Sequence, residues 1–376
     1  METAKVHFFN LDVLRFICAF AVAIAHVYES YFSWFGEPAF FSNIPTVKYV
    51  LGIFTGNLSL GVTMFFVISG FLITYLLLTE KQRFGKIHIG KFMLRRSLRI
   101  WPLYFLAIFI GYECIQLLSI PAPDYWANML FWNNFNTINT LEWQYPFAHF
   151  WSISVEEHFY LAWPLLLFFV PVNRSWILAL VGIIGSIAYR YYITQSVDAA
   201  HLQHSLYLHT LARIDEILVG ALLACIHIVR PIRVRIPAFI RVVVYLLFIG
   251  VLCAQSSSDF WVWDIYSVLF KKYVYLFFIV FWMVNYLFNE DAFLNFKQKN
   301  LLHYLGKISF GIYIYHNMMI PVYINYVVYR YKIYNFGLYF GVYFLILLVI
   351  SIVSYELFEK HFLKIKERFA FISTQR

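Results

Sequence analysis

The chain has 376 residues, of which 62% are hydrophobic and 13% are charged, and its mean hydropathy is +0.68. This composition excludes an ordinary soluble enzyme and is typical of an integral membrane protein. The formal net charge of +9 does not require a nucleic-acid partner, because the distribution of the basic residues along the chain explains it better.

Apolar stretches recur from one end of the chain to the other and predict an all-α, polytopic bundle of about ten transmembrane helices. The expected spans are residues 11–28, 58–79, 100–119, 148–170, 175–193, 205–228, 238–255, 270–288, 305–328 and 337–358. No stretch has the composition of a soluble domain, so we expect residues 1–376 to form one membrane domain. The four cysteines stand singly inside apolar stretches, so neither a metal site nor a disulfide framework is expected.

The basic residues predict the orientation of the chain. If the spans alternate in direction, 21 of the 29 Lys and Arg residues fall on one side of the membrane and 6 on the other. The positive-inside rule then puts both termini in the cytoplasm and the loop of residues 120–147 outside. The asymmetry supports an even number of spans without fixing it at ten. In that loop, Trp126, Trp132 and Trp143 form either an aromatic belt at the membrane surface or a platform for sugar rings.

The first span, LDVLRFICAFAVAIAHVY, carries Asp12, Arg15 and His26 at membrane depth. Ionisable side chains there are costly and usually mark a functional path. Arg15 and His26 are eleven residues apart, about 16 Å along one helix face, and Asp12 is near enough to pair with Arg15. Small side chains fill the same face between them, at Ala19, Val22 and Ala23. The stripe therefore leaves room for a ligand. The alternative is an interfacial ion pair and a histidine that reaches the lipid headgroups.

The second and third spans add further candidates. Ser69 and Gly70 lie within GVTMFFVISGFLITYLLL, where small residues suit close helix packing as well as a ligand. Arg96 and Arg99 lie one turn apart in KFMLRRSLRIWPLYF, so their guanidinium groups face the same way. Two such groups suit a phosphate. The alternative is a pair of headgroup anchors that only set the topology.

Three later residues are also singled out. Glu156, in FWSISVEEHFYLAWPLLLFF, lies deep in its span, where a carboxylate must pair or function. It either orients or activates a histidine or forms an ion pair with Arg213. His316, in LGKISFGIYIYHNMMI, and Glu356, in SYELFEKHF, are weaker candidates, because a histidine among tyrosines is often a satisfied core residue.

Seven segments occur in the order known for one family. They are LDVLRFICAFAVAIAH, GVTMFFVISGFLI, RRSLRIWPLYF, FWSISVEEHFYLAWP, RIDEILVGALLA, LGKISFGIYIYH and SYELFEK. Together they resemble the acyltransferase-3 family of multi-spanning membrane proteins over nearly the whole chain. The Arg-x10-His motif of that family falls on Arg15 and His26, and its Arg-x-x-Arg motif falls on Arg96 and Arg99.

The match continues at the family's WSxxVE glutamate, which falls on Glu156. The chain departs from the family at Val13, where a glycine is frequent, and at His158, where a glutamine is frequent. The departure at Val13 puts little of the resemblance in doubt. The departure at His158 leaves open which acceptor the protein uses.

The resemblance implies transfer of an acyl group, usually acetyl from cytoplasmic acetyl-CoA, to a hydroxyl of an extracytoplasmic glycan in the bacterial inner membrane. It makes the lipid bilayer, an acyl-CoA and a carbohydrate acceptor the partners. Arg15, Arg96 and Arg99 would hold the donor, and His26 would act as base or take the acyl group itself. Glu156 would hold the histidine tautomer. The alternative function is a glycan or small-molecule transporter that uses the same polar stripe without chemistry.

Overall fold

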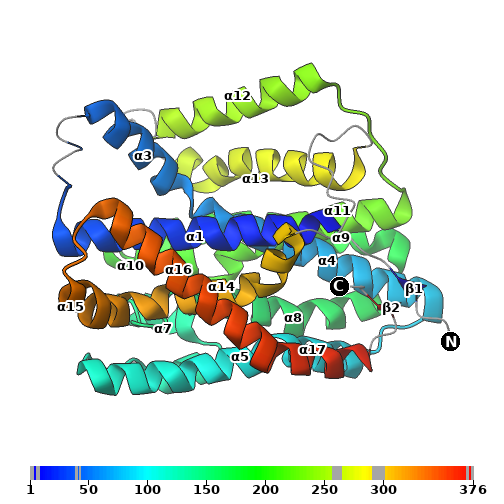
Figure 1. The fold of residues 1–376 in the computed structure, drawn as a ribbon. Helices are drawn as coiled ribbons and strands as arrows, with labels where there is room; N and C mark the ends of the chain where they lie inside the picture. The colour runs from blue at the N-terminus through cyan, green and yellow to red at the C-terminus, as the bar shows by residue number, and fades with distance from the viewer. Residues whose placement is uncertain are drawn as a thin grey trace.

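The computed structural model describes residues 4–5, 9–38, 41, 44–255, 265–289, 301–369 and 372–373. Within these ranges the chain is a bundle of helices whose axes run mostly alongside one another (Figure 1). The bundle confirms the expected all-α fold. Three of the basic residues counted above lie outside the described residues, namely Lys297, Lys299 and Arg376.

Ten long helices make up most of the bundle. They are α1 (Phe9–Phe35), α4 (Leu60–Phe84), α5 (Ile89–Leu118), α8 (Trp151–Phe169), α9 (Ser175–Ser196), α11 (Thr210–Val229), α12 (Ala238–Gln255), α13 (Ile265–Phe288), α14 (Leu301–Tyr323) and α16 (Phe336–Ser354) among the described residues. The shorter elements are α3 (Pro45–Asn57), α6 (Tyr125–Met129), α7 (Asn133–Thr140), η1 (Ala148–Phe150), η2 (Val172–Arg174), α10 (Ala199–Leu208), η3 (Ile324–Val328), α15 (Tyr329–Tyr331), η4 (Tyr355–Glu359) and α17 (Lys360–Glu367).

All ten expected spans fall in helices, but their boundaries differ. In the described part of the chain, six helical stretches are long and apolar enough to cross a membrane: those of α1, α3 with α4, α5, α9, α13 and α16 with α17. Residues 205–228, expected as one span, are broken between α10 and α11 at His209, whose backbone is extended and whose side chain caps α11. The third helix begins at Ile89 rather than residue 100, so Arg96 and Arg99 lie inside it.

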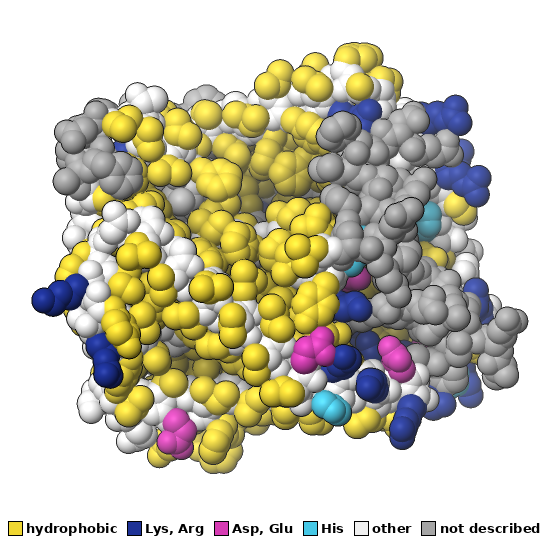
Figure 2. Space-filling view, viewed as in Figure 1, with side chains coloured by type: hydrophobic (Ala, Val, Ile, Leu, Met, Phe, Trp, Pro, Cys, Tyr) yellow, Lys and Arg dark blue, Asp and Glu magenta, His cyan; other side chains and the backbone are white. Residues whose placement is uncertain are grey.

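The two ends of the chain lie side by side. Strand β1 (Ala4–Lys5) pairs in parallel with β2 (Ile372–Ser373), as Figure 1 shows at the right of the bundle. Adjacent ends agree with an even number of crossings. On the face viewed in Figure 2, a broad apolar band crosses the middle, and most Lys and Arg side chains gather at the end where the termini lie.

Close backbone contact joins α4 to α11. A Cβ atom at Gly70 of α4 would overlap the carbonyl oxygen of Ile217, and one at Gly220 of α11 would overlap that of Val67. Only glycine lets the two backbones approach so closely, as at other helix contacts in membranes. The packing expected at Gly70 is therefore present.

The small residues of α1 serve packing as well. Ala19 and Ala23 are fully buried and Val22 is 2% exposed, and all three belong to the main hydrophobic core. A Cβ atom at Gly306 of α14 would overlap the backbone of Asp12, so α14 lies directly against α1. The expected room for a ligand is therefore absent over Ala19 and Ala23, whereas Val22 lines the large cavity described below. Small side chains on a helix face admit either a ligand or another helix, and here the helices fill the space.

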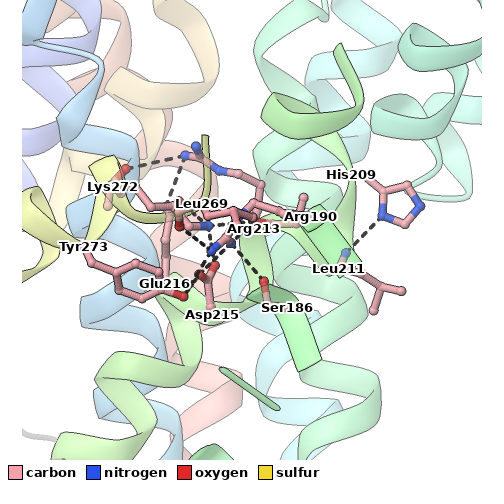
Figure 3. A network of polar contacts seen from close by, with 12 residues as sticks. Ser186, Arg190, His209, Leu211, Arg213, Asp215, Glu216, Leu269, Lys272 and Tyr273 are labelled. Atoms are coloured by element: carbon pink, nitrogen blue, oxygen red, sulfur yellow. Dashed lines mark hydrogen bonds and ion pairs between the residues drawn. The ribbon is translucent and has the colours of Figure 1, made fainter. Parts of the chain in front are cut away.

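A buried ion network fixes α13 against α9 and α11 (Figure 3). Arg190 of α9 is 2% exposed and donates to Asp215 of α11 at 2.8 Å, and Asp215 itself is fully buried. Lys272 and Tyr273 of α13 also donate to Asp215, each at 2.5 Å. The positive-inside count above places Arg190 and Lys272 among the six basic residues of the outer side. They lie within helices instead, because Asp215 supplies the countercharge.

Candidate functional site

The beginning of α1 contributes an ion pair. The guanidinium of Arg15 lies 3.4 Å from the carboxylate of Asp12, and both side chains are nearly buried. Residues three apart on a helix lie on one face, so the pairing expected from their spacing is confirmed. Asp12 therefore holds Arg15 in place.

Arg15 lines a small pocket with the two arginines of α5. This basic pocket has a volume of about 80 Å³. Its lining comes from α1, α4, α5, α8 and α14, and consists of Arg15, Val62, Phe65, Phe66, Ser69, Arg96, Arg99, Ile100, Ser152, Ile153, Glu156, Tyr160, Ser309, Phe310 and Tyr313. The structure thus brings together five of the candidate residues: Arg15, Ser69, Arg96, Arg99 and Glu156.

Arg95 and Arg96 are neighbours in sequence with different surroundings. Arg95 donates to Glu80 of α4 at 3.1 Å and to the carbonyl of Phe369 at 3.1 Å, so it ties α5 to the C-terminal segment. The guanidinium of Arg96 instead lies over the rings of Phe92 and Tyr160, at 5.7 and 5.6 Å. Successive residues of a helix point about 100° apart, so one arginine anchors the helix while the next faces the pocket.

Glu156 lines the basic pocket and does not contact His26. It accepts hydrogen bonds from Ser69 at 2.7 Å and from Tyr160 at 2.9 Å. The structure shows no contact between the described side chains of Glu156 and His26, so the expected role in holding that histidine has no geometric support. Arg213, the alternative partner of Glu156, pairs with Glu216 at 3.1 Å.

His26 opens into a second, much larger space. This large cavity has a volume of about 1450 Å³ and is bounded by α1, α4, α10, α14 and the segments around residues 120–123 and 142–151. Its polar and aromatic lining includes His26, Glu29, Ser30, Trp34, Glu142, Trp143, Gln144, Tyr145, His149, Trp151, Gln203, His204, Tyr207, Tyr313 and Asn317. Of the three tryptophans expected as belt or platform, Trp143 lines the cavity, whereas Trp126 and Trp132 do not.

Two histidines of this lining, His26 and His149, meet a third, His316, which is fully buried behind the cavity wall. The ring centroid of His26 lies 5.3 Å from that of His316, which lies 4.8 Å from that of His149. His316 Nδ1 donates to the carbonyl of Tyr313 at 2.6 Å, and His149 Nε2 donates to that of Ile314 at 3.0 Å. Because a carbonyl only accepts, these contacts leave His316 Nε2 and His149 Nδ1 as acceptors, and neither has a partner within the described chain.

The basic pocket and the large cavity meet at one place. Val62 and Tyr313 line both spaces. The hydroxyl of Tyr313 forms a hydrogen bond of 2.5 Å with Ser152, which lines the basic pocket. This hydroxyl pair lies between the arginines and the histidines.

Three residues of the candidate site, Glu29, His149 and Tyr313, were not singled out in the sequence. Glu29 has its carboxylate 3.6 Å from His26 Nδ1, one turn further along α1, and its spacing could have identified it. His149 and Tyr313 meet His26 only through helix packing, although a histidine inside an expected span was a signal. Glu356, in contrast, lies apart from both spaces and is bound by Tyr304 and Lys360.

Known proteins are similar to this chain over most of its length. A family model described as an acyltransferase domain matches residues 8–356. The O-acetyltransferase OatA of Staphylococcus aureus is 29% identical over 294 residues, which cover 71% of this chain and 46% of that protein. The peptidoglycan O-acetyltransferase OatA of Listeria monocytogenes is 30% identical over 130 residues, which cover 31% of this chain and 20% of that protein.

The chain spans less than half the length of these two relatives. No solved structure matches it. Its apolar helices and its bacterial relatives identify an integral bacterial membrane protein. Because the family model covers nearly the whole sequence, the chain belongs to the acyltransferase-3 family.

Proposed function

We propose that the protein is an O-acetyltransferase that moves an acetyl group from acetyl-CoA to a hydroxyl of a glycan. One observation carries the proposal: a pocket lined by three arginines and a cavity lined by His26 and His149 share the lining residues Val62 and Tyr313. An anionic donor and a hydroxylic acceptor need these two different environments side by side. The names of the relatives support O-acetyl transfer as the reaction.

The donor would bind at the basic pocket. Arg96, Arg99 and Arg15 offer guanidinium groups that can form paired hydrogen bonds with phosphate oxygens. A volume of about 80 Å³ is far below the ~300–1,000 Å³ of ordinary ligand pockets, so the pocket must widen when a donor enters. The pantetheine arm would then extend past Ser152 and Tyr313 toward the histidines.

The chemistry would take place at His26. A neutral imidazole accepts the proton of the acceptor hydroxyl while the hydroxyl oxygen attacks the thioester carbonyl. The C–S bond breaks, the acetyl ester forms, and the CoA thiolate takes the proton from His26. Glu29, 3.6 Å from His26 Nδ1, would orient the ring and stabilise its protonated form.

The orientation of the chain supports a cytoplasmic donor. The basic pocket lies toward the end of α1 near the chain termini, where basic residues gather in Figure 2, and the large cavity lies toward the opposite end. By the positive-inside rule, that basic end would face the cytoplasm. The acetyl group would thus cross the membrane within one domain, from Arg96 and Arg99 to His26.

Purified protein in lipid nanodiscs tests the proposal, because both faces are then accessible. We expect acetyl-CoA to be cleaved in the presence of a glycan acceptor, with release of the CoA thiol and formation of an acetyl ester detected by mass spectrometry. Arg96→Ala and Arg99→Lys should each raise the apparent dissociation constant for acetyl-CoA about tenfold or more, because each loses a hydrogen bond to a charged group.

Arg174→Ala, at the basic end but outside both spaces, is the matched control and should leave that constant unchanged. Binding of a glycan without cleavage of acetyl-CoA would favour the transporter instead. Normal binding of acetyl-CoA by Arg96→Ala and Arg99→Lys would show that these arginines only contact lipid headgroups and do not bind the donor.

A further inference from the structure

The charges around the large cavity are of one sign. Glu29 and Glu142 both line it, and the described lining includes neither Lys nor Arg. Both carboxylates belong to exposed residues, Glu29 on α1 and Glu142 in the segment before η1. The potential felt by a ligand in this space is therefore negative.

Two cations on this side of the bundle are already paired with carboxylates of their own. Arg213 lies behind the wall, 5.5 and 5.2 Å from the rings of Trp151 and Tyr207, and is paired with Glu216. Lys48, near the same end of the bundle, forms a 2.6 Å ion pair with Glu37. Arg213 and Lys48 thus have their own countercharges, and neither residue lines the cavity.

The rest of the lining suits a hydroxyl-rich ligand with flat apolar faces. Aromatic rings of Trp34, Trp143 and Tyr145 line the cavity and are half-exposed, as surfaces on which sugar rings stack must be. His149 Nδ1 is buried without a hydrogen-bond partner, and His149 itself is 3% exposed. A buried acceptor without a partner is costly, and a ligand hydroxyl would satisfy it.

The size of the cavity points to more than one sugar ring. Its volume of about 1450 Å³ exceeds the ~300–1,000 Å³ typical of small-molecule pockets. A chain of sugars would lie past both Glu29 and Glu142 on its way to His26. The charge of each unit near the reacting hydroxyl would then affect binding.

From this charge, lining and size we infer that the acceptor is an uncharged or cationic oligosaccharide and that anionic glycans are excluded. The inference rests on the proposed function, because it names the acceptor of that same site. A ligand carboxylate ~8–10 Å from one wall carboxylate, at an effective dielectric constant near 20, should bind about ten- to thirtyfold more weakly than a neutral group.

Binding of three matched tetrasaccharides to the nanodisc-embedded protein tests this inference. The N-acetylglucosamine tetramer is uncharged, the glucosamine tetramer is cationic and the galacturonic acid tetramer is anionic. Quenching of tryptophan fluorescence reports binding, because Trp34, Trp143 and Trp151 line the cavity. We expect the first two to bind and the third to bind at least tenfold more weakly, with a difference that shrinks in high salt.

Reversing the charge of Glu142 tests whether the carboxylates of the cavity wall cause the weaker binding of the anionic tetramer. Glu142→Lys should strengthen binding of the anionic tetramer about tenfold, and Glu142→Gln should give a smaller change in the same direction. Glu113→Lys is the matched control, because Glu113 is an exposed glutamate of α5 outside the cavity, and it should change nothing. Trp143→Ala should weaken all binding, whereas Trp143→Phe should retain most of it.

Equal binding of the anionic and uncharged tetramers, or an unchanged preference in Glu142→Lys, would overturn the inference. Failure of all three to bind would show that the cavity does not take glycans. The acetyl-CoA assay on the same sample separates the two proposals. A charge preference in binding without acetyl transfer would uphold the inference about the cavity and defeat the proposed reaction.

Discussion

Replacing His26 by glutamine removes the only base that the proposed reaction needs while keeping a hydrogen-bonding side chain. The side chain of His26 is 39% exposed in the large cavity, so the exchange should change the free energy of unfolding by no more than about 0.5 kcal/mol. Loss of a general base lowers rates by about 10²- to 10⁴-fold, which corresponds to about 2.7–5.5 kcal/mol in the barrier. Acetyl transfer should therefore fall by at least a hundredfold.

The assay follows acetyl ester formation by mass spectrometry and donor binding by equilibrium titration on the same purified variant. Donor binding should be unchanged, because His26 lies outside the basic pocket. His361→Gln is the control, since His361 is an exposed histidine of α17 outside both spaces, and it should be fully active. Retention of more than a tenth of the wild-type rate by His26→Gln would refute the role of base.

Arg190→Ala leaves the buried carboxylate of Asp215 with fewer partners, so it should lower the free energy of unfolding by about 3–5 kcal/mol and lower the Tm. An unchanged Tm would show that this ion network does not stabilise the fold. Gly70→Leu should prevent close packing of α4 on α11 and abolish stable expression, whereas Gly185→Leu, which meets open space, should be tolerated. A cysteine at Asn136 should be labelled by a membrane-impermeant reagent outside the cell and one at Lys86 should not, and the opposite pattern would reverse the orientation.

The spacing of residues along single helices was enough to predict part of the candidate site. The Asp12–Arg15 pair follows from positions three apart on a helix, and the common face of Arg96 and Arg99 follows from the same rule. The order of apolar stretches likewise gave the all-α fold. These features depend on residues within one or two helical turns, which a single sequence displays.

Contacts between helices could not be predicted from the sequence. Ser69 and Glu156 are 87 residues apart, and the ring of His316 reaches His26 from a helix near the other end of the chain. Helical periodicity shows which residues share a face but not which faces meet. For the same reason the small residues of α1 suggested room for a ligand, although Ala19 and Ala23 are fully buried in the hydrophobic core.

A comparison of two arginines inside the bundle shows what distinguishes a structural cation from one that awaits a ligand. Arg190 donates from both terminal nitrogens, to Ser186, to two carbonyls, to Asp215 and to Tyr273, so those donors are satisfied within the fold. Arg96 has ring contacts on Phe92 and Tyr160 but no hydrogen bond to any described residue, and it faces a pocket shared with Arg15 and Arg99. A guanidinium at membrane depth is costly unless its donors are used. The fold uses those of Arg190, whereas the donors of Arg96 have no acceptor among the described residues, as the proposed binding of an anionic donor requires.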